Sequence, residues 1–230
     1  QMNHLWSQDK KENKKLLEKY SGYNFGFFEP YELNKKTLQY NFHGGAEWMG
    51  GAVDQIKNIM FVTSNNILWE AELILDSKKK GLAPIYSSKF KRVLTMSGYP
   101  ATKPPWGTLT ALNLNNGKII WQSPFGEYKE LTKKGVPLTG TENFGGATVT
   151  SGDIVIATGT LDKKIYIFNA INGDIIYDLE LPYIGSAPPT TYMSNGEQYI
   201  LVHATGGWSL NKGYPDLVEE GNALVALKLK

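Results

Sequence analysis

The segment TALNLNNGKIIWQ, residues 110–122, decides the fold, because a close copy of it, IFNAINGDIIYDL, stands at residues 167–179. The two copies align at a spacing of 56 residues, and Trp121 of the first aligns with Tyr177 of the second. A phrase that returns at a fixed spacing indicates a repeated structural unit. The identical pairs are Asn113 and Asn169, Asn116 and Asn172, Gly117 and Gly173, Ile119 and Ile175, and Ile120 and Ile176.

The repeat extends beyond this phrase. GGAVDQIKNIMFVTSNN at 50–66 resembles GGATVTSGDIVIATGT at 145–160, and APPTTYMSNGEQYILVHATGG at 187–207 is a looser third version. LTALNL at 109–114 is echoed by LVALKL at 224–229. Each unit reads as strand, turn, strand, loop, strand, Asn-Gly turn and strand. Four antiparallel strands that recur about every fifty residues are the mark of a β-propeller blade, whereas a β-sandwich gives no reason for the phrase to recur.

Strand-length runs of β-branched and aromatic residues alternate with turn residues along the chain. Three Asn-Gly pairs join such runs, and they are the strongest short hairpin signal because both residues tolerate positive φ. Only residues 8–19 resemble a helix. The strands predicted most clearly lie at 154–159, 164–170, 174–181 and 198–204, and the Asn-Gly pairs at 116–117, 172–173 and 195–196.

The sequence therefore predicts an all-β fold, part of a β-propeller, with about three to four four-stranded antiparallel blades and a short N-terminal helix. We expect one domain over residues 1–230, with 1–41 as a helical and irregular lead-in and 42–230 as the blades. Because propeller rings close with roughly 4–8 blades, either blades on the N-terminal side or a second copy of the chain is expected to complete the ring. Trp121 and Tyr177 are interpreted as contacts between neighbouring blades rather than with a ligand.

The composition limits the possible functions. Lys and Arg number 24 and Asp and Glu 22, a net charge of +2, which argues against a nucleic-acid partner because such proteins normally present a strongly basic face. The basic run at 10–19 is interpreted as a solvated helix face. No cysteine is present, which excludes disulfides, thiolate catalysis and cysteine zinc sites. No apolar run approaches the ~20 residues that span a membrane, and the lack of a signal peptide leaves localisation open because Gln1 is not an initiator.

The phrase formed by Ala111, Asn113, Gly117 and Trp121 resembles the tryptophan-docking motif of the pyrroloquinoline-quinone (PQQ) dehydrogenases, in which Asp is usual at the position of Asn113. The resemblance runs from about Phe28 to the C-terminus, and it is closest to the glucose- and quinate-type quinoprotein dehydrogenases, which are eight-bladed periplasmic propellers. The stretches that carry it are GYPATKPPWGTLTALNLNNGKIIWQSPFGEY at 98–128, GVPLTGTENFGG at 135–146, GGAEWMGGAVD at 44–54 and the third repeat at 187–207.

This resemblance implies a function. In that family PQQ and a calcium ion (Ca2+) lie in the central funnel, and a carboxylate acts as base while hydride passes from an alcohol or sugar substrate to the quinone. The chain resembles only the C-terminal part of such enzymes. The resemblance therefore implies that the PQQ-stacking Trp, the catalytic Asp, most calcium ligands and the basic residue near the quinone oxygens lie upstream of Gln1, with no catalytic and no metal residue in this chain. We therefore expect a periplasmic enzyme with an electron acceptor such as ubiquinone or a cytochrome, and no activity from this chain alone.

Two glycine-rich loops are the candidate cofactor site. In GGAEWMGG at 44–51 and TENFGG at 141–146, a polar and an aromatic residue are flanked by glycines just before a predicted strand. Glycines let the backbone approach a planar ligand, the aromatic offers a ring face and the polar group a hydrogen bond. The resemblance places these strand starts in the funnel. The predicted cofactor-binding residues are Glu47, Trp48, Asn143 and Phe144; the alternatives are that the aromatics fill the core and the polar residues cap loop amides.

Two other functions stay open from the sequence. A non-catalytic propeller with the same docking motif would act as a protein-binding scaffold in the cell envelope, and a pseudo-enzyme would keep the fold without the cofactor. A partial ring exposes blade faces built to be buried, which predicts a homodimer. His4, His43 and His203 share no metal-ligand spacing, and no Rossmann, phosphate-loop or Ser-His-Asp pattern occurs.

Overall fold

The structure is a computed structural model that describes residues 4–26, 29–40, 42, 45–46, 48–76, 81, 83–206 and 219–228. Its contacts divide the chain into two compact units, which are described separately. The helix unit comprises Gln1–Gly45 and Asn66–Lys103, and the blade unit comprises Ala46–Asn65 and Pro104–Lys230. The single domain expected from the sequence stays a prediction.

The helix unit holds the one long helix of the described chain, α1, Lys10–Tyr20. Asp9 caps it, because its Oδ1 accepts a hydrogen bond of 2.7 Å from the backbone N–H of Lys11. This agrees with the helix predicted at 8–19. Leu16 and Tyr20 turn the apolar side of α1 towards the sheet, where they join a buried cluster with Leu38 and Leu68.

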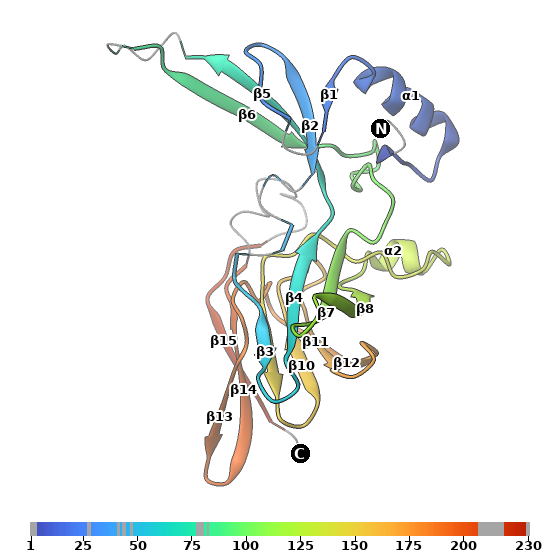
Figure 1. Ribbon diagram of the computed structural model, residues 1–230. Coiled ribbons are helices and arrows are strands. Elements are labelled where there is room, and N and C mark those ends of the chain that lie inside the picture. Colours follow the sequence, from blue (N-terminus) through green and yellow to red (C-terminus); the bar gives the residue numbers. More distant parts are fainter. Residues whose placement is uncertain are drawn as a thin grey trace. The chain divides into compact units, whose positions relative to one another are not determined.

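The sheet of the helix unit has the strand order β1-β2-β5-β6 (Figure 1). Two of its strands lie within residues 1–41, which the sequence predicted as helical and irregular; they are short, and β2 finds its antiparallel partner β5 only some thirty residues later, so no local pattern marks them. The β1–β2 pair is parallel, unlike the all-antiparallel blades expected. The strands are β1 (Asn24–Phe25), β2 (Lys36–Tyr40), β5 (Leu68–Leu75) and β6 (Tyr86–Arg92).

The blade unit contains three antiparallel sheets, which confirm the predicted repeat (Figure 1). A short helix, α2, Lys129–Thr132, lies between the first and second sheets in the chain. Blade 1 is β3 (Ala52–Asp54), β4 (Ile59–Asn65), β7 (Gly107–Asn113) and β8 (Lys118–Pro124). Blade 2 is β9 (Ala147–Thr150), β10 (Ile154–Ala157), β11 (Lys164–Asn169) and β12 (Ile175–Glu180). Blade 3 is β13 (Thr190–Ser194), β14 (Glu197–Ala204) and β15 (Ala223–Lys228).

The repeated phrase builds the same hairpin twice. The register shifts between Ala111 and Leu112 in blade 1 and at the aligned step between Ile167 and Phe168 in blade 2. Asn113 Oδ1 accepts from the backbone N–H two residues later at 2.9 Å, and Asn169 does the same at 2.8 Å. The Asn side chain therefore starts each turn, as Asx turns do.

All three predicted Asn-Gly pairs lie in turns between paired antiparallel strands, and the turns have two different conformations. Asn195 and Gly196 both have positive φ, 51° and 78°, as a two-residue hairpin requires. In the turns at 116–117 and 172–173 only the glycine does, with φ of 70° and 78°. These turns are two residues longer than the turn at 195–196, because Asn113 and Asn169 open them, and the second Asn keeps an ordinary φ.

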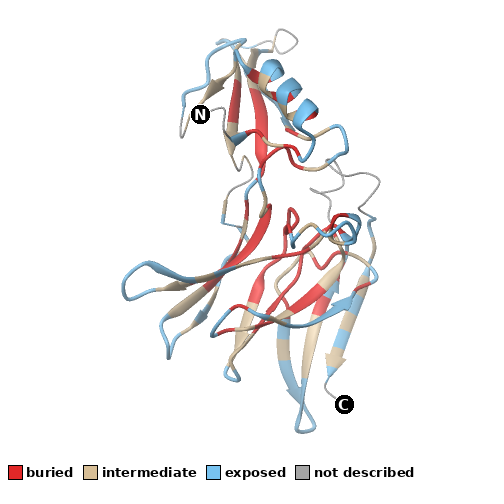
Figure 2. Cartoon of the chain, turned by 90° about the vertical axis from the view of Figure 1, so that its right-hand side faces the viewer, coloured by how far each residue is buried: buried red, intermediate tan, exposed pale blue. Residues whose placement is uncertain are grey.

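The three sheets stack face to face. Phe61, Leu109 and Phe125 of the blade 1 side pack against Val155 and Phe168 of blade 2. On the opposite face of blade 2, Ile156 and Ile165 pack against Val202 and Ala204 of blade 3. Because neighbouring strand residues point to opposite faces, one strand, β10, serves both cores. In Figure 2 the tips of the hairpins are exposed, and the buried residues lie towards the other end of the strands.

Trp121 contacts the neighbouring blade as predicted. Its indole Nε1 donates a hydrogen bond of 3.0 Å to the carbonyl oxygen of Ala170, in the β11–β12 turn of blade 2. A Cβ on Gly173 in the same turn would lie 2.5 Å from the Trp121 ring. Tyr177, the aligned residue of blade 2, is 56% exposed, so the prediction fails there. The described part of β15 ends at Lys228, and no turn like that at 170–173 is described in blade 3 for Tyr177 to contact.

Candidate site at the loop end of blades 1 and 2

The four predicted site residues fall into three situations. Glu47 lies outside the described residues. Trp48 is 79% exposed, so it fills no core within the described part of this chain. Asn143 and Phe144 are 0% and 6% exposed and lie just before β9, as the loop of Trp48 lies just before β3.

Both loops meet at the end of β4, which we call the loop end of the blades. Ala46 forms an antiparallel bridge with Ser64, two residues before Trp48 in the chain. Asn143 Nδ2 donates to the carbonyl oxygen of the same Ser64 at 3.3 Å, and Thr63 Oγ1 donates to the carbonyl oxygen of Gly145 at 3.3 Å. The structure thus brings together the two loops that the sequence singled out.

Asn65 and Asn143 make the densest polar contact at the loop end. Asn65 Oδ1 accepts from the backbone N–H of Asn143 at 2.9 Å, and Asn65 Nδ2 donates to the carbonyl oxygen of Asn143 at 2.8 Å. Asn143 Nδ2 returns a hydrogen bond of 2.9 Å to Asn65 Oδ1. Asn65 was not predicted as a site residue. The only sequence feature that points to it is an amide residue at the end of the strand that begins with the apolar run IMFV.

The amide of Asn143 has a defined orientation. The group facing Asn65 Oδ1 and the Ser64 carbonyl must be the NH2, because both partners are acceptors. Its Oδ1 is buried and has no hydrogen-bond partner among the described residues. An unsatisfied buried acceptor costs about 1–3 kcal/mol, so this oxygen is suited to a donor from a ligand or a bound water.

Phe144 and its flanking glycines serve the packing of blade 2. The backbone N–H of Phe144 donates to the carbonyl oxygen of Gly159 at 3.2 Å. A Cβ on Gly145 would lie 1.9 Å from the carbonyl oxygen of Thr158, and Gly159 has φ of 110°. Here the glycines allow two backbone segments to touch, and the buried Phe144 ring supports the core alternative.

Polar residues surround the amide pair where a core would ordinarily be apolar. The sequence runs TSNN and ATGT, at the ends of β4 and β10, and TGTEN, in the loop before β9, are the sequence signal for this polar cluster. Polar side chains at the loop end that are at most 5% exposed are Thr63, Thr108, Thr139, Thr141, Glu142, Thr158 and Thr160.

A second polar cluster fastens the segment after β8 to blade 2. Asp162 accepts hydrogen bonds from the backbone N–H of Glu127 at 2.9 Å and from the hydroxyls of Tyr166 and Thr160. Burial raises the pKa of Asp162, against the lowering effect of these hydrogen bonds. Lys164 pairs with Glu127 at 3.0 Å and with Asp178 at 2.8 Å. Each carboxylate of the cluster accepts a hydrogen bond or an ion pair within it, which indicates a structural role.

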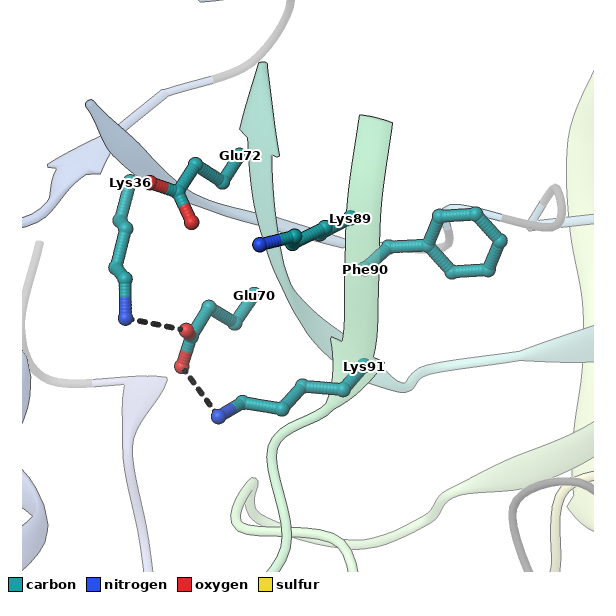
Figure 3. Close-up of a pocket in the computed structure, with 6 residues that line it drawn as sticks. All are labelled: Lys36, Glu70, Glu72, Lys89, Phe90 and Lys91. Atoms are coloured by element: carbon teal, nitrogen blue, oxygen red, sulfur yellow. Dashed lines mark ion pairs between the residues drawn. The ribbon is translucent and has the colours of Figure 1, made fainter. Parts of the chain in front are cut away.

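The helix unit has a shallow pocket of about 210 Å³ on its sheet, separate from the predicted site residues (Figure 3). Glu70 lies between two ammonium groups, Lys36 at 3.0 Å and Lys91 at 3.4 Å, while the Phe90 ring points away from them. The hydrogen bond to Glu70, and a weaker one to Tyr23, raise the pKa of Lys36. Lys36 and Lys91 thus share one carboxylate, that of Glu70.

Comparison with known proteins decides the family. The sequence profile "PQQ: Glucose/ethanol/alcohol dehydrogenase, beta-propeller domain" matches residues 1–200. The chain belongs to this family. This match confirms the family resemblance that was inferred from the docking motif and the glycine-rich loops.

Relatives of this chain include the glycerol dehydrogenase large subunit of Gluconobacter oxydans (strain 621H). It is 28% identical over 213 residues, which cover 79% of this chain and 29% of that protein. The quinoprotein glucose dehydrogenase of the same strain is 31% identical over 213 residues, covering 79% and 26%. The quinate/shikimate dehydrogenase (quinone) of Acinetobacter baylyi is 28% identical, covering 71% and 23%. The chain thus spans less than a third of the length of these PQQ-family proteins.

Solved structures of family members share the fold. A europium-containing methanol dehydrogenase superposes with a TM-score of 0.61 at 18% identity, covering 81% of this chain and 30% of that one. The quinohemoprotein alcohol dehydrogenase from Comamonas testosteroni gives 0.51 at 20% identity, covering 75% and 24%. The β-propeller fold predicted from the repeat is confirmed.

The described residues contain neither a cluster of metal-ligand side chains nor a helix that could span a membrane. Among the described residues no three His, Asp or Glu side chains gather closely enough to hold a metal ion, so calcium stays a prediction that rests on the family resemblance. No helix in the described part of the chain is both long and apolar enough to cross a membrane.

Proposed function

We propose that this chain is part of a PQQ-dependent dehydrogenase that oxidises an alcohol or a sugar, and that the loop end of blades 1 and 2 contacts the quinone. One observation carries this proposal: the two glycine-rich loops meet at Ser64, where one presents the exposed ring of Trp48 and the other the unsatisfied Oδ1 of Asn143. An aromatic face and a buried acceptor fit a planar ligand that carries donor groups.

Each proposed contact has a distinct role. Trp48 would offer a second aromatic face to the ring system, Asn143 Oδ1 would accept a hydrogen bond, and Glu47 in the same loop as Trp48 would add a polar contact. Phe144 supports the loop from the core. PQQ, when bound, supplies the electron sink for hydride removal, and the protein supplies position and electrostatics.

Substrate and electron acceptor are proposed from the relatives. Their names give glycerol, glucose and quinate or shikimate as substrates, which favours a polyol or another hydroxylated small molecule here. One relative is named for a quinone and a structural neighbour is a quinohemoprotein, so the proposed acceptor is ubiquinone or a cytochrome. Calcium, a periplasmic location and a homodimer through exposed blade faces remain proposals.

The catalytic activity is proposed for the enzyme as a whole. Because the chain covers under a third of its relatives, we expect the 230-residue chain by itself not to oxidise glucose or quinate with added PQQ and calcium. Robust PQQ-dependent turnover by the isolated chain would contradict this expectation.

Titration with PQQ, followed by tryptophan fluorescence and calorimetry, tests the proposed site. We expect saturable binding that Trp48→Ala weakens about tenfold, since an aromatic stack contributes roughly 0.5–1.5 kcal/mol. The control is Ser123→Ala, which removes a hydrogen bond between blades of 2.6 Å to Gly173 and touches neither loop. No binding, or equal binding by Trp48→Ala and wild type, would leave the scaffold function as the better interpretation.

A further inference from the structure

The peptide of Asn143 is held from two sides. On one side Asn143 forms an antiparallel bridge with Thr160, and the N–H of Phe144 bonds to Gly159 at 3.2 Å, as two strands would. On the other side Asn143 pairs with the side chain of Asn65, the last residue of β4, and not with a strand backbone: the N–H and C=O of Asn143 both bond to that side chain, at 2.9 and 2.8 Å. The carboxamide of Asn65 therefore stands where a neighbouring strand's peptide group would stand.

Few residues can make this two-point contact. It needs one donor and one acceptor in a plane, at the geometry of a peptide group, and only the Asn and Gln side chains offer both without protonation. Gln has one methylene more and would reach too far at a buried site that is closely packed. Ser and Thr carry their donor and acceptor on a single oxygen, which cannot span the two backbone groups, and ionised Asp has no donor.

The same contact controls the side chain of Asn143. One oxygen, Asn65 Oδ1, accepts from both the backbone and the side chain of Asn143. With the Ser64 carbonyl, it engages the whole NH2 group and leaves Oδ1 as the one uncommitted atom of the amide. Without Asn65 the amide could rotate and present a donor instead.

We propose that Asn65 is a positioning residue for the quinone site: it fixes the 141–146 loop and turns Asn143 so that it offers an acceptor, which selects ligand groups bearing O–H or N–H over carbonyl or carboxylate oxygens. This inference rests on the proposed function. It gives Asn65 a role beyond joining blades 1 and 2, which Trp121 and Ser123 already do at a different point.

The test compares Asn65→Ala with Ser123→Ala in the same chain. Each variant loses hydrogen bonds between blades 1 and 2, so both lower the thermal midpoint. Only Asn65→Ala is expected to weaken PQQ binding, about tenfold or more, as measured by calorimetry. If the loss in PQQ affinity is no larger in Asn65→Ala than in Ser123→Ala, Asn65 is merely structural and the proposal is wrong.

Asn65→Asp adds a readout that a structural role would not give. A protonated carboxyl has both an acceptor and an O–H donor, so it restores the two-point contact that the ionised form breaks. We expect the ratio of wild-type to Asn65→Asp affinity for PQQ to be about tenfold at neutral pH and to approach one as the pH falls towards the pKa of the new carboxyl. A ratio that does not change with pH would overturn the proposal.

Amide hydrogen exchange separates this inference from the proposed function. In the chain without ligand, Asn65→Ala is expected to speed exchange of the backbone N–H groups of residues 143–146 at least tenfold, while Ser123→Ala leaves them protected. Should wild type bind no PQQ, the proposed function fails, and fast exchange in Asn65→Ala alone would still support the loop-holding half. Equal exchange in both variants would refute that half as well.

Discussion

Trp121 and Tyr177 occupy the same position of the repeat, yet one is held between two blades and the other faces solvent. Their strands, register shifts and turn hydrogen bonds correspond residue by residue. What differs is the neighbour: Trp121 finds the Ala170 carbonyl and the bare surface of Gly173, and the described part of blade 3 offers Tyr177 nothing equivalent. The repeat thus determines each hairpin locally, while docking depends on the next blade.

Truncation of the two aromatics should show the largest difference. We expect Trp121→Ala to cost about 3 kcal/mol of unfolding free energy, because it removes a large packed ring and its hydrogen bond, and Tyr177→Ala about 0.5 kcal/mol, because the ring is exposed. Urea denaturation of both variants measures this. Similar losses would mean that Tyr177 is docked in solution and that the two junctions are alike.

The matched glycines of the two turns give the next largest effect. Gly117 and Gly173 have φ of 70° and 78°, so alanine is strained at both, by about 1–2 kcal/mol. At Gly117 nothing lies within 4 Å of the added Cβ, whereas at Gly173 the Trp121 ring lies at 2.5 Å. We expect Gly173→Ala to be about 2 kcal/mol worse than Gly117→Ala in denaturation, and a gap near zero would show that the Trp121 contact is loose.

The ion pairs of Lys164 should give the smallest effect, and one that depends on pH. Burial by itself lowers the pKa of Lys164, but its hydrogen bonds to Asp178 and Glu127 outweigh burial and raise that pKa. The stabilisation is therefore fully present below the ordinary lysine pKa of ~10.4 and is lost as the pH rises through the higher folded value.

Lys164→Met checks this reasoning. We expect it to lower the unfolding free energy by about 1 kcal/mol from pH 6 to 9 and the difference from wild type to shrink at more alkaline pH. The control is Lys129→Met, whose partner Glu180 is 3.5 Å away and largely exposed, and which should change little. A difference that persists unchanged at strongly alkaline pH would assign the effect to lost packing.

The blades could be predicted from the sequence because their signals are local. The strands at 154–159, 164–170, 174–181 and 198–204 match β10, β11, β12 and β14 within a few residues, since alternation and turn residues act over short distances. The parallel β1–β2 pair and the partner of β2 were missed because nothing near them in sequence specifies the pairing.

The candidate site was predictable only in part. Glycine-rich loops before strands pointed to Trp48 and Asn143, and the structure brings their loops together at Ser64. Asn65 could not be found this way, because its bonds join residues 78 positions apart and leave no periodic trace. The sequence also could not distinguish the two aromatic residues, because both stand next to glycines before a strand. In the structure Trp48 is exposed and Phe144 is buried.

A crystal structure of the chain with PQQ bound tests the central claim most directly, because it distinguishes the two ends of blades 1 and 2. We predict the quinone at the loop end, stacked on Trp48, with a donor group directed at Asn143 Oδ1 and the Asn65 contact intact. Density at the turn beside Trp121, or in the helix-unit pocket of Lys36 and Glu70, would contradict the account.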